Sequence, residues 1–438
     1  MAETRRIRLA IPPKVCAAWP RALMVFMSLA VVIFTTGLAS AETLTLDQAV
    51  DQALRNNPDF LAARQQLRTG EARLVKARYW NAFNPAVQAG AAQWRSRGTG
   101  SVAEPAVGVS LEIEVAGQRG KRIQEAEDNL VKVRAQVADA QRTLMAQVKS
   151  SFYQVLYVKR RLELFQRIED LNRRLRDASE ARFKTGEGTR MEANLEEIRY
   201  DQSRRDTLVG RRDYQNGLRE LRRVVGIDPD APLDLNGSLS VRPASIDAAT
   251  LLEVAFANRP DLKAGNAEIK RVEAETALTK RLIVPNPVIS GTYSLEPSAP
   301  GSNFRIVGGT VGISMPLFDR KQAELTALAG DRMRATYNRR AVLLNIGTQV
   351  RDAVAGYDAA AEAVQIYESD MVSRVEQNFG FIETAYRAGK IDLLQLVVVQ
   401  NDLVRADLSY LDALSEYWVA RTNLEFAIGT DLNKAVRP

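Results

Sequence analysis

The sequence predicts a mainly α-helical protein with a small β part, built as an internal tandem duplication in which each copy carries long antiparallel helices and one β-hairpin. Three observations support this fold class. They are a repeat of about 200 residues, proline-free stretches that permit very long helices, and a short segment of alternating apolar residues in each copy. The 438 residues are 46% hydrophobic, which is enough for a substantial core.

The first 41 residues have the features of a secretory signal peptide. Basic residues precede an apolar run at 22–36, and the small residues Ala39 and Ala41 follow as a cleavage site. We therefore expect an exported chain that begins after Ala41. Removing the segment takes away five basic residues and one acidic residue, so the net charge falls from +7 to +3. An uncleaved membrane anchor is the alternative, although the apolar run is short for a span.

The rest of the chain reads as two copies of one unit. Asn-Pro-Asp at 57–59 recurs as Arg-Pro-Asp at 259–261, and Asn-Pro at 84–85 recurs at 286–287, each time 202 residues later. We expect the following division: signal peptide 1–41, first repeat 42–228, linker 229–245, second repeat 246–431 and tail 432–438.

Each repeat is expected to run in the order helix, β-hairpin, long helix, tight turn and helix. The predicted bounds are hairpin 85–115, long helix 117–184 and last helix 188–226 in the first repeat, and hairpin 287–317, long helix 319–387 and last helix 391–428 in the second.

The long helices follow from the placement of proline. No proline occurs from 106 to 228 or from 317 to 437, and a proline inside a helix costs about 3 kcal/mol. Apolar residues recur every three or four positions between 130 and 165, as in helices packed side by side. A helix of roughly 68 residues is about 100 Å long, so the protein must be elongated. Asp319 and Gln322 could form a capping box where the second long helix begins.

Both hairpins alternate apolar residues with small or polar ones. Strands of about ten residues with this period match the strands of outer-membrane barrels, while a soluble hairpin resting on helices is the alternative. If the strands cross a membrane, Ser110, Glu112 and Glu114 should face water. The positions expected to face lipid are Val109, Leu111, Ile113, Val115, Val311, Ile313 and Met315.

The number of strands bears on the oligomer. Four strands cannot close a barrel, and an open sheet edge is not tolerated in lipid. Two copies would give eight strands, whose interior side chains fill, and three copies would give twelve strands around a lumen. A homotrimer is therefore the simplest arrangement if the protein conducts.

Taken together, these features resemble the TolC-type outer membrane efflux proteins. The segments Pro-Leu-Phe-Asp-Arg-Lys-Gln at 316–322 and Gly-Gln-Arg-Gly-Lys-Arg at 117–122 look most like the cobalt-zinc-cadmium (CzcC-like) branch, and the turn from Tyr386 to Leu396 is similar to the family's periplasmic tip. The resemblance implies a trimeric channel in the outer membrane of a Gram-negative bacterium, with a twelve-stranded β-barrel continued by a helical α-barrel through the periplasm. It also implies a periplasmic adaptor, a proton-driven inner-membrane pump and heavy-metal cargo.

The same resemblance assigns roles to the two turns that separate the long helices. The residues expected to contact the adaptor are Gly186, Glu187, Gly188, Thr189, Gly389, Lys390, Ile391 and Asp392. A purely structural role as helix caps is the alternative. Gln395 and Val398 occupy the positions where family members carry acidic residues at the periplasmic entrance, and helix packing is the alternative for both.

Composition argues against other functions. The chain has no histidine, and its one cysteine, Cys16, lies in the predicted signal peptide. We therefore expect no metal site, no cofactor and no enzyme activity, so cations would pass hydrated. Basic runs within helices are expected to be solvated rather than to bind nucleic acid. A multidrug or type I secretion channel of the same fold and an adhesive coiled-coil surface protein remain as alternatives.

Overall fold

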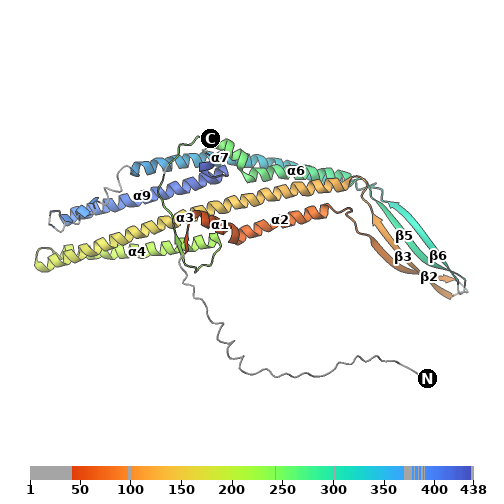
Figure 1. Cartoon of the computed structure of the whole chain (residues 1–438), viewed down its shortest axis with the longest axis horizontal. Coiled ribbons are helices and arrows are strands. Elements are labelled where there is room, and N and C mark those ends of the chain that lie inside the picture. The colour runs from red at the N-terminus through yellow and green to blue at the C-terminus, as the bar shows by residue number, and fades with distance from the viewer. Residues whose placement is uncertain are drawn as a thin grey trace, which may run out of the picture.

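The computed structural model describes residues 42–435 except 97–99, 242, 300–301, 369–376, 379, 383, 386–387 and 389. The predicted signal peptide lies outside these residues. Long helices run side by side along one axis, and a β-sheet forms one end of the molecule (Figure 1). The predicted fold class, mainly α with a small β part, is confirmed. Within the described ranges, none of the helices carries an apolar stretch long enough to span a bilayer.

The elements of the first repeat are β1 (Glu42–Leu44), α1 (Leu46–Asn56), α2 (Pro58–Ala77), β2 (Ala86–Ser96), β3 (Gly100–Glu112), α3 (Gln118–Thr185) and α4 (Arg190–Val225). The first repeat begins in the middle of the molecule and runs to the sheet. Its long helix α3 then leads to the opposite end, and α4 returns toward the middle (Figure 1). The second repeat follows the same path. Its elements, with the strand before it and the short helix after it, are β4 (Leu233–Leu235), α5 (Ala248–Asn258), α6 (Pro260–Arg281), β5 (Pro287–Ala299), β6 (Ser302–Ile313), α7 (Gln322–Glu368), α9 (Leu393–Ile428) and α10 (Leu432–Ala435).

Where the sequence predicts one helix before each hairpin, the structure has two. The break falls at Asn57 in the first repeat and at Arg259 in the second, and both residues have extended backbone. Pro58 and Pro260 follow directly, and a proline disfavours the helical conformation of the residue before it. Each proline then starts the next helix, where its missing N–H is not needed.

The two longest helices begin in the same unusual way. The residue before α3, Gly117, and the residue before α7, Lys321, both have left-handed backbone, with φ of 75° and 58°. The capping box predicted for Asp319 and Gln322 does not form, because the Asp319 carboxylate accepts from the backbone N–H of Lys321 and Gln322 accepts from that of Arg320. Ion pairs from Lys321 to Asp319 and Glu324 accompany the strained backbone.

The sheet contains four antiparallel strands in the order β2-β3-β5-β6, so β3 and β5 join the two repeats. Both hairpins have the same register, since Val87 opposite Val109 corresponds to Ile289 opposite Val311. This agreement supports the duplication at the level of single residue pairs.

The strands end earlier than the predicted hairpins do. Ile113 and Val115 follow the last residue of β3, and Met315 follows the last residue of β6. The ladder stops because the neighbouring strand β5 begins at Pro287, which has no N–H to donate; the last bond runs from the N–H of Ile113 to the carbonyl of Pro287 (3.0 Å).

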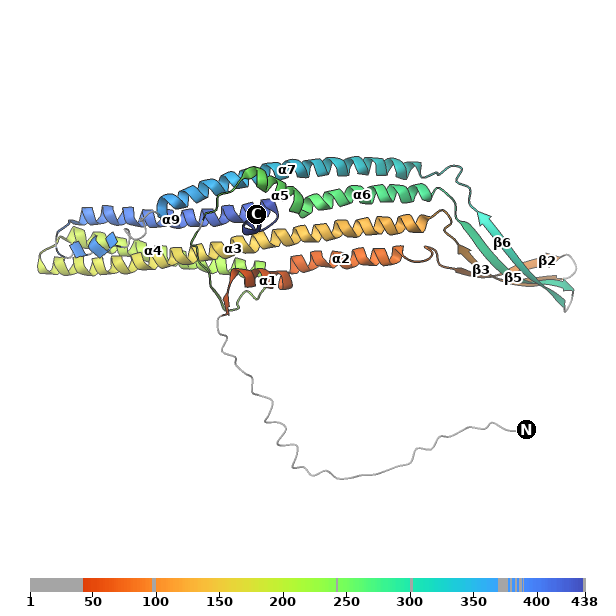
Figure 2. The ribbon, with the colours of Figure 1, turned by 45° about the horizontal axis from the view of Figure 1, so that its top comes forward.

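The main hydrophobic core lies in the middle of the molecule, where α1, α5 and the segment between the repeats pack on the long helices (Figure 2). Tyr357 and Tyr417 are fully buried there, and the hydroxyl of Tyr357 accepts from the N–H of Ala244 (2.9 Å). The indole of Trp418 donates to the carbonyl of Leu239 (3.1 Å). The predicted linker is therefore fixed on the helices, and its strand β4 pairs in parallel with β1.

Candidate functional site

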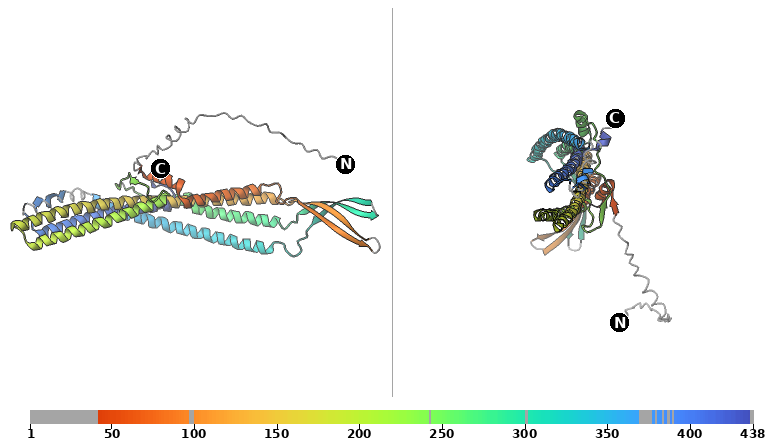
Figure 3. Two further views of the ribbon diagram at one scale, coloured as in Figure 1. Left: turned by 90° about the horizontal axis from the view of Figure 1, so that it is seen from below. Right: turned by 90° about the vertical axis from the view of Figure 1, so that its left-hand side faces the viewer.

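The turn between α3 and α4 lies at the end of the molecule opposite the sheet (Figure 3). Gly186 ends α3 with φ of 79°, and the N–H groups of Glu187 and Gly188 both donate to the carbonyl of Arg182. Thr189 begins α4 with a capping box, in which its hydroxyl accepts from the N–H of Glu192 and the Glu192 carboxylate accepts from the N–H of Thr189 (2.9 Å). The turn is rigid at both ends, and Glu187 between them is exposed.

The turn before α9 has the same capping chemistry with different residues. The Asp392 carboxylate accepts from the N–H of Gln395 (2.7 Å), and the Gln395 side chain accepts from the N–H of Asp392 (3.3 Å). Lys390 is exposed, whereas Ile391 is half-buried beside a small apolar cluster of Leu171, Leu175 and Leu396. Gly389, the counterpart of Gly186, lies outside the described residues.

The two positions proposed for the entrance are exposed in the single protomer, Val398 by 51%. Gln395 also has the local role just described, since its side chain completes the cap of α9. One of the polar contacts between α9 and α3 lies slightly further along α9. The buried Gln400 amide donates to the Asn172 side chain (2.6 Å), a contact that was not predicted because it joins residues 228 positions apart.

A buried carboxylate lies in the same half of the molecule. The Glu196 side chain is fully buried, and the nearest Arg199 nitrogen is 3.9 Å away. Burial raises the pKa of Glu196, and the charge of Arg199 offsets this only in part. The adjacent Glu197 is 58% exposed and lies 3.9 Å from Arg176. The two carboxylates therefore point to different environments and do not form an acid–base pair.

The half of the sheet nearer the helices has one apolar face and one polar face. Register places the following residues on the apolar face: Val87, Val107, Val109, Leu111, Ile289, Tyr293, Val307 and Val311. Several of them are strongly exposed, for example Val307 (82%) and Val87 (71%). Toward the far end of the strands, the same face carries Gln93, Arg95 and Arg305. The opposite face carries mostly polar or small residues, and its polar members include Gln88, Ser110, Glu112, Ser290, Thr292 and Thr310. Val288, Phe304 and Ile306 are large apolar residues on this face.

A polar network holds the sheet to the helices. The Asn286 amide donates to the Glu112 carboxylate (2.9 Å) and accepts from Gln118 (2.9 Å), which lies at the start of α3. Glu114, which the strand pattern predicts to face water, instead forms a largely buried ion pair with Arg122. Glu114 does not follow the alternation because β3 ends at Glu112.

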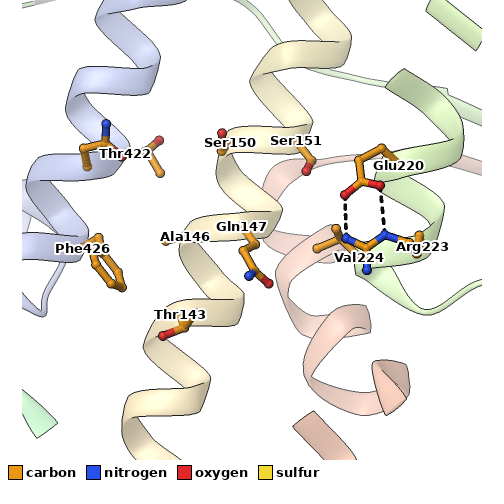
Figure 4. Close-up of a pocket in the computed structure, with 11 residues that line it drawn as sticks. Thr143, Ala146, Gln147, Ser150, Ser151, Glu220, Arg223, Val224, Thr422 and Phe426 are labelled. Atoms are coloured by element: carbon orange, nitrogen blue, oxygen red, sulfur yellow. Dashed lines mark hydrogen bonds and ion pairs between the residues drawn. The ribbon is translucent and has the colours of Figure 1, made fainter. Parts of the chain in front are cut away.

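An open pocket of about 380 Å³ lies between α3, α4 and α9 (Figure 4). Its polar lining comes mostly from serine, threonine and glutamine side chains. Its only ion pair joins Glu220 to Arg223 (2.6 Å), and the hydrogen bonds from Arg223 hold the pKa of the Glu220 carboxyl below its usual value. Among the described residues, no three acidic side chains come together at a spacing that could hold a metal ion.

Comparison with known proteins identifies the family of this chain. The sequence matches the outer membrane efflux protein family at residues 49–227 and again at 251–430, one match to each repeat. The chain belongs to this family. Its members are channel proteins, and two consecutive matches to one chain agree with the duplication seen in the strand registers.

A relative and two solved structures extend the comparison. The cobalt-zinc-cadmium resistance protein CzcC of Cupriavidus metallidurans is 24% identical over 390 residues, covering 89% of this chain and 91% of the relative. The structure of CusC has a TM-score of 0.71 at 15% identity, with 88% of this chain and 92% of that chain covered. The open-state MtrE channel of Neisseria gonorrhoeae also gives 0.71, at 17% identity and 88% and 89% coverage. Both structures support the TolC-type fold.

Proposed function

We propose that this protein is the outer-membrane duct of a tripartite efflux system, in which three copies form a passive channel for heavy-metal cations. The observation that carries the proposal is the division of the four-stranded sheet into an apolar and a polar face at one end of a helical rod. A sheet with water on both sides would not need an apolar face across all four strands. Three copies would provide twelve strands.

The apolar face is the surface that we assign to lipid. Leu111 and Val311 lie on it on either side of Ile289, and Val109 and Val307 lie on the same face of β3 and β6. Ile113, Val115, Ile313 and Met315 continue it or follow the strand ends, at the level where a membrane surface would lie. The polar face, with Ser110 and Glu112, would line the lumen. The cell compartment that follows is the outer membrane, with the helices in the periplasm.

We assign adaptor contact to the two turns at the far end, at Gly186–Thr189 and at Gly389–Asp392. Exposed residues on rigidly capped turns suit docking, because binding then orders little additional chain. Ile391 is the weakest member of this set, since it packs against the cluster around Leu396. Gln395 and Val398 are assigned to the entrance that follows. The pump, which we expect to be proton-driven, would select the cargo.

Metal cations are the proposed cargo because the relative from Cupriavidus metallidurans is a cobalt-zinc-cadmium resistance protein. The channel itself would bind them weakly. Residues 42–438 contain no histidine or cysteine, which are the side chains that zinc prefers.

The test is a deletion strain scored for sensitivity to zinc, cobalt, cadmium, copper and hydrophobic drugs. The expected result is that the deletion strain is sensitive to the metals and that the intact gene restores resistance. Sensitivity to drugs alone would favour the multidrug alternative.

A substitution tests the assignment of the first turn. Glu187→Trp should abolish the rescue while the protein stays in the outer membrane, because a bulky side chain obstructs docking at the exposed turn. Glu187→Gln is the matched control and should rescue. Full rescue by Glu187→Trp would contradict the assignment of this turn.

A further inference from the structure

The charges of the sheet are separated by face. On the face assigned to lipid, the charged residues of the four described strands are Arg95 of β2 and Arg305 of β6. On the opposite face they are Glu104, Glu112 and Glu296. Both arginines lie toward the end of the strands that is remote from the helices (Figure 1). At that end, the face assigned to lipid therefore carries positive charge, and no carboxylate of these strands shares it.

The position of Arg305 along β6 corresponds to the surface of an apolar band. Arg305 is exposed, and Val307 and Tyr293 lie on the same face, nearer the helices. From Ile313 to Arg305 the strand advances eight residues, which is about 27 Å along the strand and about 21 Å in height at a tilt of about 40°. Transmembrane barrels have an apolar band about 25 Å tall. Arg305 thus lies at the level expected for the outer surface of the membrane.

The two arginines lie on the two edge strands of the sheet. Strands β2 and β6 each have one neighbour in the described sheet, and three strand spacings, about 14 Å in all, separate them. Arg95 and Arg305 of one copy are therefore too far apart to bind one small anion together. In the closed ring of copies that the proposed function requires, β6 of one copy lies beside β2 of the next.

The duplication gives the register of that contact. At the end of the ladder between β3 and β5, Ala106 lies opposite Ser294. Moving each by 202 positions to its counterpart places residue 308 opposite residue 92 of the next copy, and three residues further along, Arg305 lies opposite Arg95. The counterparts of the two arginines inside the chain are an alanine at 103 and a proline at 297. The pair of charges is thus specific to the contact between copies.

Two arginines in this arrangement need an anion. Side chains directly opposite each other on antiparallel strands are about 4.5–5.5 Å apart at Cβ, and like charges there are destabilising. A phosphate group removes the repulsion, because it accepts hydrogen bonds from two guanidinium groups at once. The apolar surface begins directly beside Arg305 at Val307, which is 82% exposed. Acyl chains would cover this surface, whereas a free phosphate ion would leave it bare.

We propose that Arg305 of one copy and Arg95 of the next bind the phosphate group of a lipid in the outer leaflet, whose acyl chains lie along the apolar face. The inference rests on the proposed function, which supplies the membrane and the ring of copies. The site is absent from a single copy and occurs once at each contact between copies.

The test compares the temperatures at which purified wild-type and Arg305→Gln complexes dissociate into single chains in detergent. Lipid A that carries both of its phosphates is the probe. Without lipid, Arg305→Gln should dissociate at a temperature no lower than that of wild type, because a repulsion between like charges is gone. With lipid A the order should reverse. The variant should also bind lipid A about tenfold or more weakly, which is the effect of one lost hydrogen bond to a charged group. A merely structural arginine would change both temperatures in the same direction.

Matched controls isolate the phosphate and the two arginines. Lipid A without its phosphates, and inorganic phosphate alone, should not stabilise the wild-type complex. Arg95→Gln should reproduce the effects of Arg305→Gln. Arg281→Gln removes the same charge at an exposed position at the end of α6, on the other side of the sheet from the proposed site, and should behave as wild type.

The outcomes separate the lipid site from the proposed function. Equal stabilisation of wild type and Arg305→Gln by lipid A, or equal stabilisation of wild type by the lipid without phosphates, would overturn the site and leave the duct in place. Equal stabilisation by inorganic phosphate would overturn the assignment to a lipid. A native mass of one chain for the wild-type protein would overturn the proposed function itself. If Arg305→Gln does not assemble, Arg305→Lys takes its place, since lysine keeps the charge but lacks the planar guanidinium, and weaker binding of lipid A is again expected.

Discussion

The two repeats differ most clearly at the joint where each broken helix meets the end of the last long helix. In the first repeat, the Asn57 side chain accepts from the N–H of Phe60 and donates to the carbonyl of Val224 (both 2.9 Å). In the second, Arg259 leaves α6 without a side-chain cap and donates instead to the carbonyl of Ala427 (3.2 Å). Each side chain thus reaches the end of the last long helix of its own repeat, α4 for Asn57 and α9 for Arg259.

The remaining contacts of Arg259 show what an arginine requires at the position where the first repeat has Asn57. Its guanidinium is buried, with only 3% exposed, and pairs with Asp261 (2.6 Å) and with Gln349 (2.7 Å). The neutral amide of Asn57 satisfies its hydrogen bonds within the joint. The buried guanidinium of Arg259 needs two further polar partners, which compensate its charge. The backbone of the joint has therefore been kept while its chemistry has diverged.

The largest expected difference between the joints concerns the glycines that end α4 and α9. Gly226 and Gly429 both have left-handed backbone, which costs another residue about 1–2 kcal/mol. A side chain at Gly226 would lie 2.6 Å from the carbonyl oxygen of Asn56, whereas one at Gly429 would lie 3.2 Å from the Arg259 side chain. Gly226→Ala should therefore lower stability by about 3 kcal/mol or more.

Gly429→Ala is the matched control, with a loss of about 1–2 kcal/mol from the backbone alone. Thermal unfolding of the detergent-solubilised proteins measures both. Equal shifts would mean that the close approach at Asn56 is relieved by small movements.

The next difference concerns the polar side chains themselves. Arg259→Ala leaves the Asp261 carboxylate without its partner and should cost about 3–5 kcal/mol, as for other broken buried pairs. Asn57→Ala removes a helix cap and one hydrogen bond and should cost about 1–2 kcal/mol. Chemical denaturation of the two variants side by side measures the difference, and a larger loss for Asn57→Ala would reverse the comparison.

The smallest effect is the pH dependence of the second joint. Burial raises the pKa of Asp261, but the hydrogen bonds and charge of Arg259 outweigh this and leave the pKa below its usual value. The carboxylate therefore stabilises the fold above the unfolded-state pKa of about 3.9, and this stabilisation is lost as the pH falls through the lower folded-state value. The stability difference between wild type and Asp261→Asn should be constant from pH 7 to 5 and shrink below about pH 4.

An Arg259→Gln background provides the control, because without the guanidinium the change with pH should be smaller. An undiminished change in that background would show that another group holds the Asp261 carboxylate in its charged form.

Much of the fold was predictable because it depends on strong periodic signals. The spacing of apolar residues and the absence of proline predict α3. The alternation of apolar with small or polar residues predicts β3 and indicates which residues share a face of the sheet with Val109. Pairing of β1 with β4 could not be predicted, since two three-residue strands so far apart in the chain have no local signature. The left-handed backbone at Lys321 was missed for a related reason, because a lysine does not signal such a conformation.

The candidate site was less predictable than the fold. The capping box at Thr189 has a sequence signature, with glutamate three residues later, but the burial of Glu196 and the contact between Asn172 and Gln400 depend on how α3, α4 and α9 pack. Charged and amide residues in a helical repeat are usually solvated, so the pattern alone assigns them to the surface.

The most direct test of the central claim compares two adjacent residues of β3 that lie on opposite faces of the sheet. Val109→Arg places a charge on the face assigned to lipid, which costs about 2–4 kcal/mol at the bilayer centre and less toward its surfaces. Ser110→Arg places the same charge on the face assigned to the lumen. The measurement is the amount of each protein in the outer-membrane fraction. We predict that Val109→Arg is depleted there and Ser110→Arg is retained, and equal amounts, or the reverse order, would contradict the placement of this sheet in a membrane.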